Sequence, residues 1–115
     1  MTSTTPYVIE ISGDAGLRAA QAVAAQLRQA LAAHDAVAVA TGAITGADIT
    51  TIQLLLSARR QAEISHKSLS LTEAPSGVFR DLLVASGCLS SDGRPLTQDG
   101  GFWTPQTRQD KGLAA

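Results

Sequence analysis

The sequence has few cysteines, few aromatic residues and no long apolar run, and each shortage excludes a class of protein. The one cysteine, Cys88, cannot form an internal disulfide. The first residues lack the basic and apolar regions of a secretory signal, so we expect a cytoplasmic protein. The most apolar stretch, residues 36–47, contains two glycines and is far shorter than the roughly 20 residues of a membrane-spanning helix. We therefore expect no membrane insertion.

Charge and aromatic content argue against nucleic-acid binding. Nine basic and ten acidic residues give a formal net charge of -1, and the basic residues are scattered along the chain and form no block. One tryptophan, one tyrosine and two phenylalanines are too few and too dispersed to stack the bases of a single strand. We expect no nucleic-acid partner.

Motifs for catalysis and metal binding are missing too. The two histidines, His34 and His66, stand apart, with no second ligand at metal spacing. The chain has no nucleophile elbow, no His-Glu-x-x-His motif and no phosphate-binding loop. We therefore expect a binding module without catalytic residues, metal or cofactor, not an enzyme.

The sequence does contain a regular alternation of strand and helix patterns. Apolar runs bounded by glycine predict strands, and apolar residues at three- and four-residue spacing predict amphipathic helices. We expect strands at residues 7–12, 36–41 and 67–72, a turn at 13–16, helices at 17–34 and 49–64, and a third helix with Pro75 in its first turn and Gly87 at its end. This order predicts the α/β class, with a mostly parallel or mixed sheet of about four strands and packed helices.

The pattern ends near Leu89, which predicts a single domain over residues 7–89. Residues 90–115 are rich in turn and linker residues, so we expect a flexible C-terminal tail that is loosely ordered or docked through Phe102 and Trp103. Within the domain, the apolar stripes that should face the core start at Leu17 in the first helix and at Val78 in the third.

The most informative stretch is the junction at residues 45–60. Asp48 follows Gly46 at the position of a helix N-cap, where its carboxylate can accept from the backbone N–H of Thr50 or Thr51. In α/β proteins, loops between a strand and a helix carry function. We therefore predict a partner-binding site made of Gly46, Asp48, Thr50, Thr51 and Ile52.

The order of these motifs resembles the STAS domain family, the sulfate-transporter and anti-sigma-factor-antagonist module. The resemblance covers residues 8–89 and is carried by Val37-Ala-Val-Ala40, by Asp48 at the head of a helix, by Leu55-Leu56 and by Leu82-Leu83. It implies a STAS-like fold and a non-enzymatic regulatory protein that acts by protein–protein interaction in bacterial signal transduction. The segment 53–58 is similar to that of small stand-alone STAS proteins associated with chemotaxis.

The resemblance also implies a switch and a partner. Anti-sigma-factor antagonists are phosphorylated directly after the aspartate, but that position is Ile49 here, so Thr50 and Thr51 are the candidate phosphorylation sites. The implied partner is a signalling kinase or a chemotaxis component. The alternative is a MlaB-like STAS subunit of a lipid-transport ABC complex, whose partner is the transporter ATPase. Two further readings stay open: a small-ligand cleft beside the first strand, and a homodimer formed through an exposed strand edge.

Overall fold

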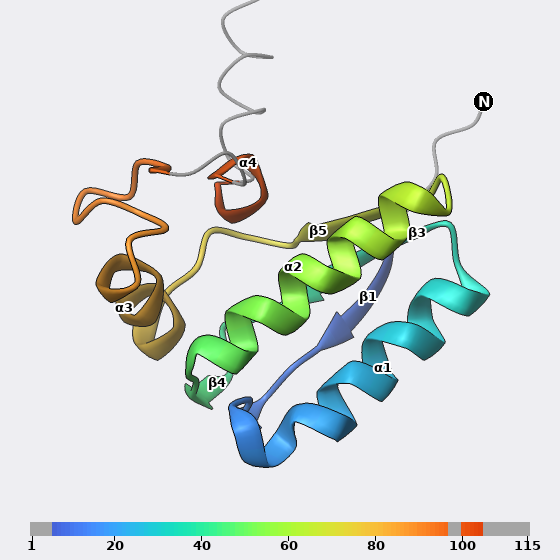
Figure 1. Ribbon diagram of the computed structural model, residues 1–115, viewed down its shortest axis with the longest axis horizontal. Coiled ribbons are helices and arrows are strands. Elements are labelled where there is room, and N and C mark those ends of the chain that lie inside the picture. Colours follow the sequence, from blue (N-terminus) through green and yellow to red (C-terminus); the bar gives the residue numbers. More distant parts are fainter. Residues whose placement is uncertain (1–5, 97–99, 105–115) are drawn as a thin grey trace, which may run out of the picture.

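A computed structural model describes residues 6–96 and 100–104 of the chain. Short strands alternate with helices along it (Figure 1). In chain order the elements are β1 (Tyr7–Glu10), β2 (Gly13–Asp14), the 3-10 helix η1 (Leu17–Ala19), α1 (Ala20–Ala33), β3 (Ala36–Ala40), β4 (Ile44–Gly46), α2 (Ile49–Ile64), β5 (Ser68–Leu71), α3 (Gly77–Ala85) and α4 (Gly100–Trp103). The predicted α/β class is confirmed.

The strands form two parallel sheets in place of the single sheet of about four strands that we expected. The larger sheet has the order β1-β3-β5, and the smaller one pairs β2 with β4. In the larger sheet Ile9 lies opposite Val39, and Val39 lies opposite Leu71. The smaller sheet arises because Gly13 and Asp14, predicted as part of a turn, pair with Ile44 and Gly46.

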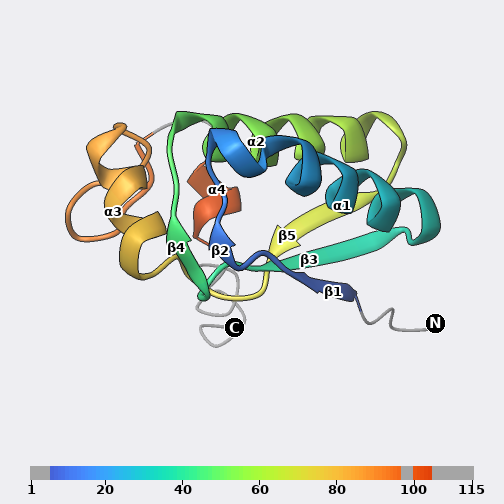
Figure 2. The same cartoon turned by 90° about the horizontal axis from the view of Figure 1, so that it is seen from below.

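Helices α1 and α2 cover the same face of the larger sheet (Figure 2). Alternate strand residues point to this face because the side-chain period of a strand is two. Together with the inward helix residues they form one core, which contains Ile9, Val37, Val39, Leu69 and Leu71 from the strands and Val23, Leu27, Leu31, Ile52, Leu55 and Ala62 from the helices. This core fixes the two helices side by side.

The helix predictions are accurate in the middle of the chain and less so at its two ends. Helix α2 spans Ile49–Ile64 with Asp48 as its N-cap, as predicted. The predicted first helix divides into η1 and α1, and Leu17 is 69% exposed and does not join the inward stripe. Pro75 lies before α3, whose N-cap is Ser76, and Val78 is 43% exposed. Both errors occur in a first turn, where one residue of register moves a side chain by about 100°.

The described part of the C-terminal segment packs on the domain. Phe102 is 5% exposed and Trp103 is fully buried. The ring of Trp103 meets Phe79 edge-on at a centroid distance of 5.8 Å, and the guanidinium of Arg59 lies 5.5 Å from the Phe102 centroid. These contacts attach α4 to α2 and α3 through aromatic burial. Residues 97–99 and 105–115 lie outside the described residues, so a flexible tail there stays a prediction.

Strands β1 and β5 are the two edges of the larger sheet. The edge position of β5 agrees with its alternation of Ser68 and Ser70 with buried leucines. A homodimer through one of these edges stays a prediction. Within the part of the chain that the structure describes, no helix is both long enough and apolar enough to cross a membrane.

Candidate partner-docking site

The carboxylate of Asp48 joins two helix starts. Its Oδ1 accepts a hydrogen bond from the backbone N–H of Thr50 at 2.9 Å, and its Oδ2 accepts one from the backbone N–H of Leu17 at 2.9 Å. The first bond caps α2, and the second holds the first residue of η1, 31 positions earlier in the chain. The backbone N–H of Leu17 is the largest cause of the lowered pKa of Asp48, and Thr50 adds to it. Asp48 is therefore a structural clamp as well as a cap.

The hydroxyl of Thr51 completes a capping box. Its Oγ1 accepts from the backbone N–H of Asp48 at 3.1 Å and donates to the carbonyl oxygen of Ala15 at 2.7 Å. Both Thr51 and Ala15 are fully buried, so these bonds replace contacts with water that the groups have lost. The hydroxyl thus links the start of α2 to the segment that follows β2.

Two glycines let the loops approach each other. A Cβ on Gly16 would lie 2.6 Å from Oδ2 of Asp48, and a Cβ on Gly46 would lie 3.3 Å from Oδ1 of Asp14. The carbonyl oxygen of Gly46 accepts from the backbone N–H of Ala15 at 2.7 Å. Glycine is required at position 16 because any side chain there would push the Asp48 carboxylate away from its donors.

The structure brings the five predicted site residues together but does not expose all of them. Thr51 is 0% and Ile52 is 3% exposed, so in this conformation neither side chain offers surface to a partner, and a kinase would reach Thr51 only after the clamp opened. Gly46, Asp48 and Thr50 are partly exposed. Of the two candidate phosphorylation sites, Thr50 is thus the more accessible hydroxyl.

Two exposed apolar side chains beside Asp48 were missed as site residues. Leu17 is 69% exposed and Ile49 is 54% exposed. Leu17 is hydrogen-bonded to the Asp48 carboxylate through its backbone, and Ile49 is the next residue after Asp48. The segment before α1 and the start of α2 lie at one end of the molecule (Figure 1). The sequence signal for Ile49 was present, since it is an apolar residue in a first turn, but only the fold places it near Leu17.

The central carboxylate of the site is paired within the protein. The Asp48 carboxylate is occupied by backbone donors, and no group of three His, Cys, Asp or Glu side chains that could hold a metal ion occurs among the described residues. The exposed groups at this end are an aliphatic pair, a threonine hydroxyl and loop backbone. Such a surface is suited to contact with another protein.

Comparison with known proteins identifies the family. No curated protein matches the chain. The family model described as "Mlab, STAS domain" matches residues 2–88, which is more than half of the 115 residues. The matched region includes β1 to α3 and the whole of the Asp48 clamp. The chain therefore belongs to the STAS domain family.

Proposed function

We propose that this protein is a non-enzymatic regulatory module of the cytoplasm that acts by docking a partner protein at the start of α2. The docking surface consists of Leu17, Gly46, Asp48, Ile49 and Thr50. The observation that carries the proposal is the exposure of Leu17, whose backbone is bonded to Asp48, and of Ile49, the residue after Asp48. Covering one such aliphatic side chain contributes about 1.5–3 kcal/mol, so the pair can anchor an interface.

The clamp supports this proposal because it makes the surface rigid. The bonds of Asp48 and Thr51 hold η1 and α2 in fixed positions. A partner therefore meets a preformed surface and loses little conformational entropy in ordering it. In this role the buried residues Thr51 and Ile52 hold the start of α2 in place, and the exposed residues of the docking surface contact the partner.

For the partner we propose a protein of a bacterial signalling pathway, either a kinase or a chemotaxis component. A second candidate is the ATPase of a lipid-transport ABC complex, in which this chain would be a STAS subunit. The description of the matching family model as "Mlab, STAS domain" favours this second candidate. Both use the same docking surface, so the identity of the co-purified protein separates them.

The test is affinity purification of the tagged protein from its own cells, with wild type compared with Ile49→Glu. The matched control is Ile64→Glu, because Ile64 is 66% exposed at the other end of the same helix. We expect the partner to be lost with Ile49→Glu and kept with Ile64→Glu. Equal recovery with both folded variants would refute the docking surface. Mass spectrometry of the recovered partner distinguishes a kinase or chemotaxis protein from an ABC ATPase.

We further propose Thr50 as the switch residue of this surface. A phosphate there would lie at the N-terminus of α2, where the helix dipole favours it, but close to the Asp48 carboxylate, which repels it. It would also add charge next to Ile49 in the first turn of α2 and so oppose apolar docking. Mass spectrometry of the peptide that contains Thr50 and Thr51 is the measurement, and an unmodified peptide from cells in every growth condition would refute the switch.

A further inference from the structure

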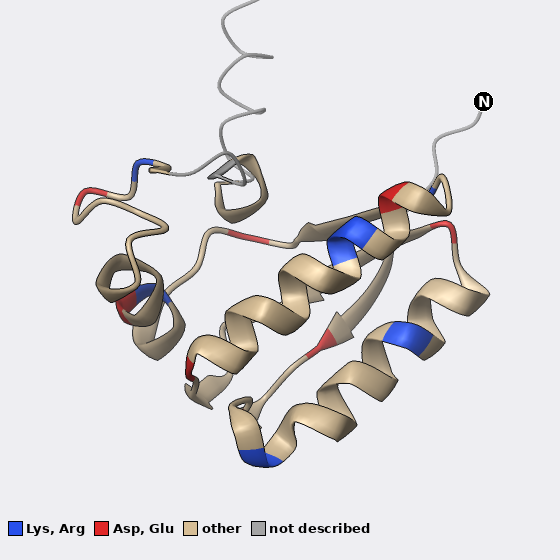
Figure 3. Ribbon diagram, viewed as in Figure 1, with Lys and Arg blue, Asp and Glu red and all other residues tan. Residues whose placement is uncertain are grey.

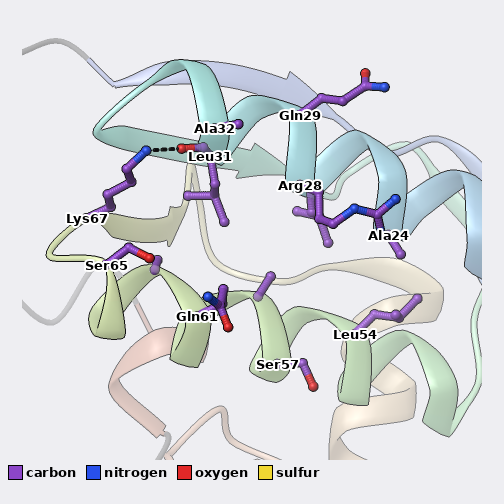
Figure 4. Close-up of a pocket in the computed structure, with 13 residues that line it drawn as sticks. Ala24, Arg28, Gln29, Leu31, Ala32, Leu54, Ser57, Gln61, Ser65 and Lys67 are labelled. Atoms are coloured by element: carbon purple, nitrogen blue, oxygen red, sulfur yellow. Dashed lines mark hydrogen bonds between the residues drawn. The ribbon is translucent and has the colours of Figure 1, made fainter.

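A groove between α1 and α2 is separate from the proposed docking surface. Its volume is about 710 Å³. Leu27, Leu31 and Ala62 form its floor and are almost fully buried. The lining as a whole comes from Ala24, Leu27, Arg28, Gln29, Leu31 and Ala32 on α1, Leu54, Ser57, Ala58, Gln61 and Ala62 on α2, and Ser65 and Lys67 after it. The close-up shows the two helices flanking this groove (Figure 4).

The charges of the groove are of one sign. Arg28 and Lys67 are its charged residues, and no described lining residue is acidic. Lys67 Nζ donates to the carbonyl oxygen of Leu31 at the end of α1 (Figure 4), which uses one of the three donors of the ammonium. The whole chain has a formal net charge of -1, so this positive region is a local feature and complements an anionic ligand.

Helix α1 has an unusual outer surface. A surface helix of a globular protein normally carries charged residues on its solvent side. The sequence of α1, AQAVAAQLRQALAA, has Arg28 as its single charged residue, and Figure 3 shows one basic and no acidic segment on this helix. Ala32, on the groove side, is exposed. Apart from Arg28, the exposed residues of α1 are uncharged, namely Gln21, Gln29 and three alanines. The helix therefore carries little charge of its own that a docking element would have to desolvate.

The shape of the groove favours a helix as the occupant. Its lining spans residues 24–32 on α1 and residues 54–62 on α2, which at a rise of 1.5 Å per residue is about 12 Å on each helix. About two turns of a helix fit this length, which is the distance from i to i+7. The rim carries Gln29, Ser57 and Gln61, which suit the polar flanks of such a helix, whereas an alkyl chain would gain nothing from them.

We propose that the α1–α2 groove binds an amphipathic, acidic helix of a partner protein. The apolar stripe of that helix packs on Leu54, Ala58 and Leu27, and its flanking carboxylates pair with Arg28 and Lys67. This is helix-in-groove recognition with apolar anchors at i, i+3, i+4 and i+7. The site is independent of the docking surface at Ile49, and one partner can engage both.

A displayed library of 14-residue helical peptides tests the proposal on the whole protein. Its positions i, i+3, i+4 and i+7 are fixed as leucine, and its flanking positions are randomised. We expect selection to enrich Asp and Glu at the flanks. A synthetic peptide of the enriched sequence is then titrated against the protein by calorimetry, and its contact residues are mapped by NMR shifts. We expect weaker binding at high salt, because exposed ion pairs are screened.

Two pairs of variants locate the binding. Arg28→Glu should weaken binding about tenfold, since it replaces the attraction of an exposed ion pair by a similar repulsion. Arg60→Glu, on a face of α2 that does not line the groove, should change binding less than twofold. Ala32→Trp should block the groove and weaken binding at least tenfold. Ala33→Trp, next to it on α1 but outside the lining, should have little effect.

Several outcomes would overturn the proposal. These are enrichment of basic flanks, equal effects of the two variants within either pair, and NMR shifts confined to other surfaces. Binding of dodecanoate in the groove without binding of any peptide would assign it to an anionic amphiphile. Concentration-dependent dimerisation that Ala32→Trp abolishes would assign it to a second copy of the chain. Because Ile49→Glu should leave peptide binding unchanged, failure here is distinguishable from failure of the proposed function.

Discussion

Replacing Thr51 by valine removes the hydroxyl at the centre of the Asp48 clamp and keeps the shape of the side chain. The change breaks the bonds to the carbonyl oxygen of Ala15 at 2.7 Å and from the backbone N–H of Asp48 at 3.1 Å. Thr51 and Ala15 are fully buried, so the carbonyl oxygen loses its partner and cannot turn to water. Each lost bond costs about 1 kcal/mol, and an unpaired buried group costs about 1–3 kcal/mol. We expect Thr51→Val to lower the free energy of unfolding by about 2–3 kcal/mol.

Urea unfolding followed by circular dichroism measures this loss. We expect the midpoint to fall with an unchanged slope, because the folded surface is the same. Thr51→Ser is the matched control, since it keeps the hydroxyl and loses one buried methyl, at a cost of about 1 kcal/mol. A valine variant as stable as wild type, or a serine variant less stable than the valine variant, would show that the hydrogen bonds of Thr51 do not hold the site together.

Further predictions concern the site, the end of α2 and the docked C-terminal segment. Gly16→Ala should cost about 1–3 kcal/mol in urea unfolding, because its Cβ would lie 2.6 Å from Oδ2 of Asp48; unchanged stability would contradict the clamp. The pKa of Asp48 is lowered from 3.8 in the folded protein, so its contribution to stability is present above pH 3.8 and is lost as the pH falls through the lower folded pKa. The Tm difference between wild type and Asp48→Asn should therefore shrink below pH 3.8. A difference that stays constant would show that the ionised carboxylate of Asp48 does not stabilise the fold. His66 has a φ of 61°, a conformation that costs a non-glycine residue about 1–2 kcal/mol. Glycine avoids this cost but loses more backbone entropy on folding, which cancels part of the gain. His66→Gly should therefore stabilise the protein by about 0.5–1 kcal/mol in thermal unfolding. Trp103→Ala should cost about 3–5 kcal/mol because Trp103 is fully buried, and a cost below 1 kcal/mol would show that α4 does not stabilise the domain in solution.

Helices and strands could be predicted where one short segment contains both the apolar periodicity and the capping or turn residues that define the element. Helix α2 could be predicted at both ends because Asp48 provides a cap and the periodic spacing continues to Ala62, two residues before the helix ends. The strands around residues 36–40 and 68–71 follow in the same way from their apolar runs. Strand β4 could not be predicted, since its three residues carry too little pattern and form a strand only by pairing with β2.

The candidate site shows the same division. The role of Asp48 as the N-cap of α2 could be predicted from the sequence. The second hydrogen-bond donor to the Asp48 carboxylate could not be predicted, because the backbone N–H of Leu17 is 31 positions away along the chain. The burial of Thr51 likewise depends on Ala15. The sequence around a threonine in a first helical turn is the same whether its hydroxyl is exposed to solvent or buried. The accessibility of the hydroxyl therefore depends on the tertiary structure.

By itself, the sequence determined the α/β class, the cap of α2 and the family, because these depend on periodicity, capping chemistry and motif order within short segments. Tertiary structure alone decided which residues at the cap face solvent and that the backbone of Leu17 lies against the start of α2. It also decided that α1 and α2 enclose a groove whose described lining residues include two basic side chains and no acidic one. The physical reason is that exposure and charge complementarity depend on residues far apart in the chain. They are set only when the two parallel crossovers place both helices on one face of the sheet (Figure 2).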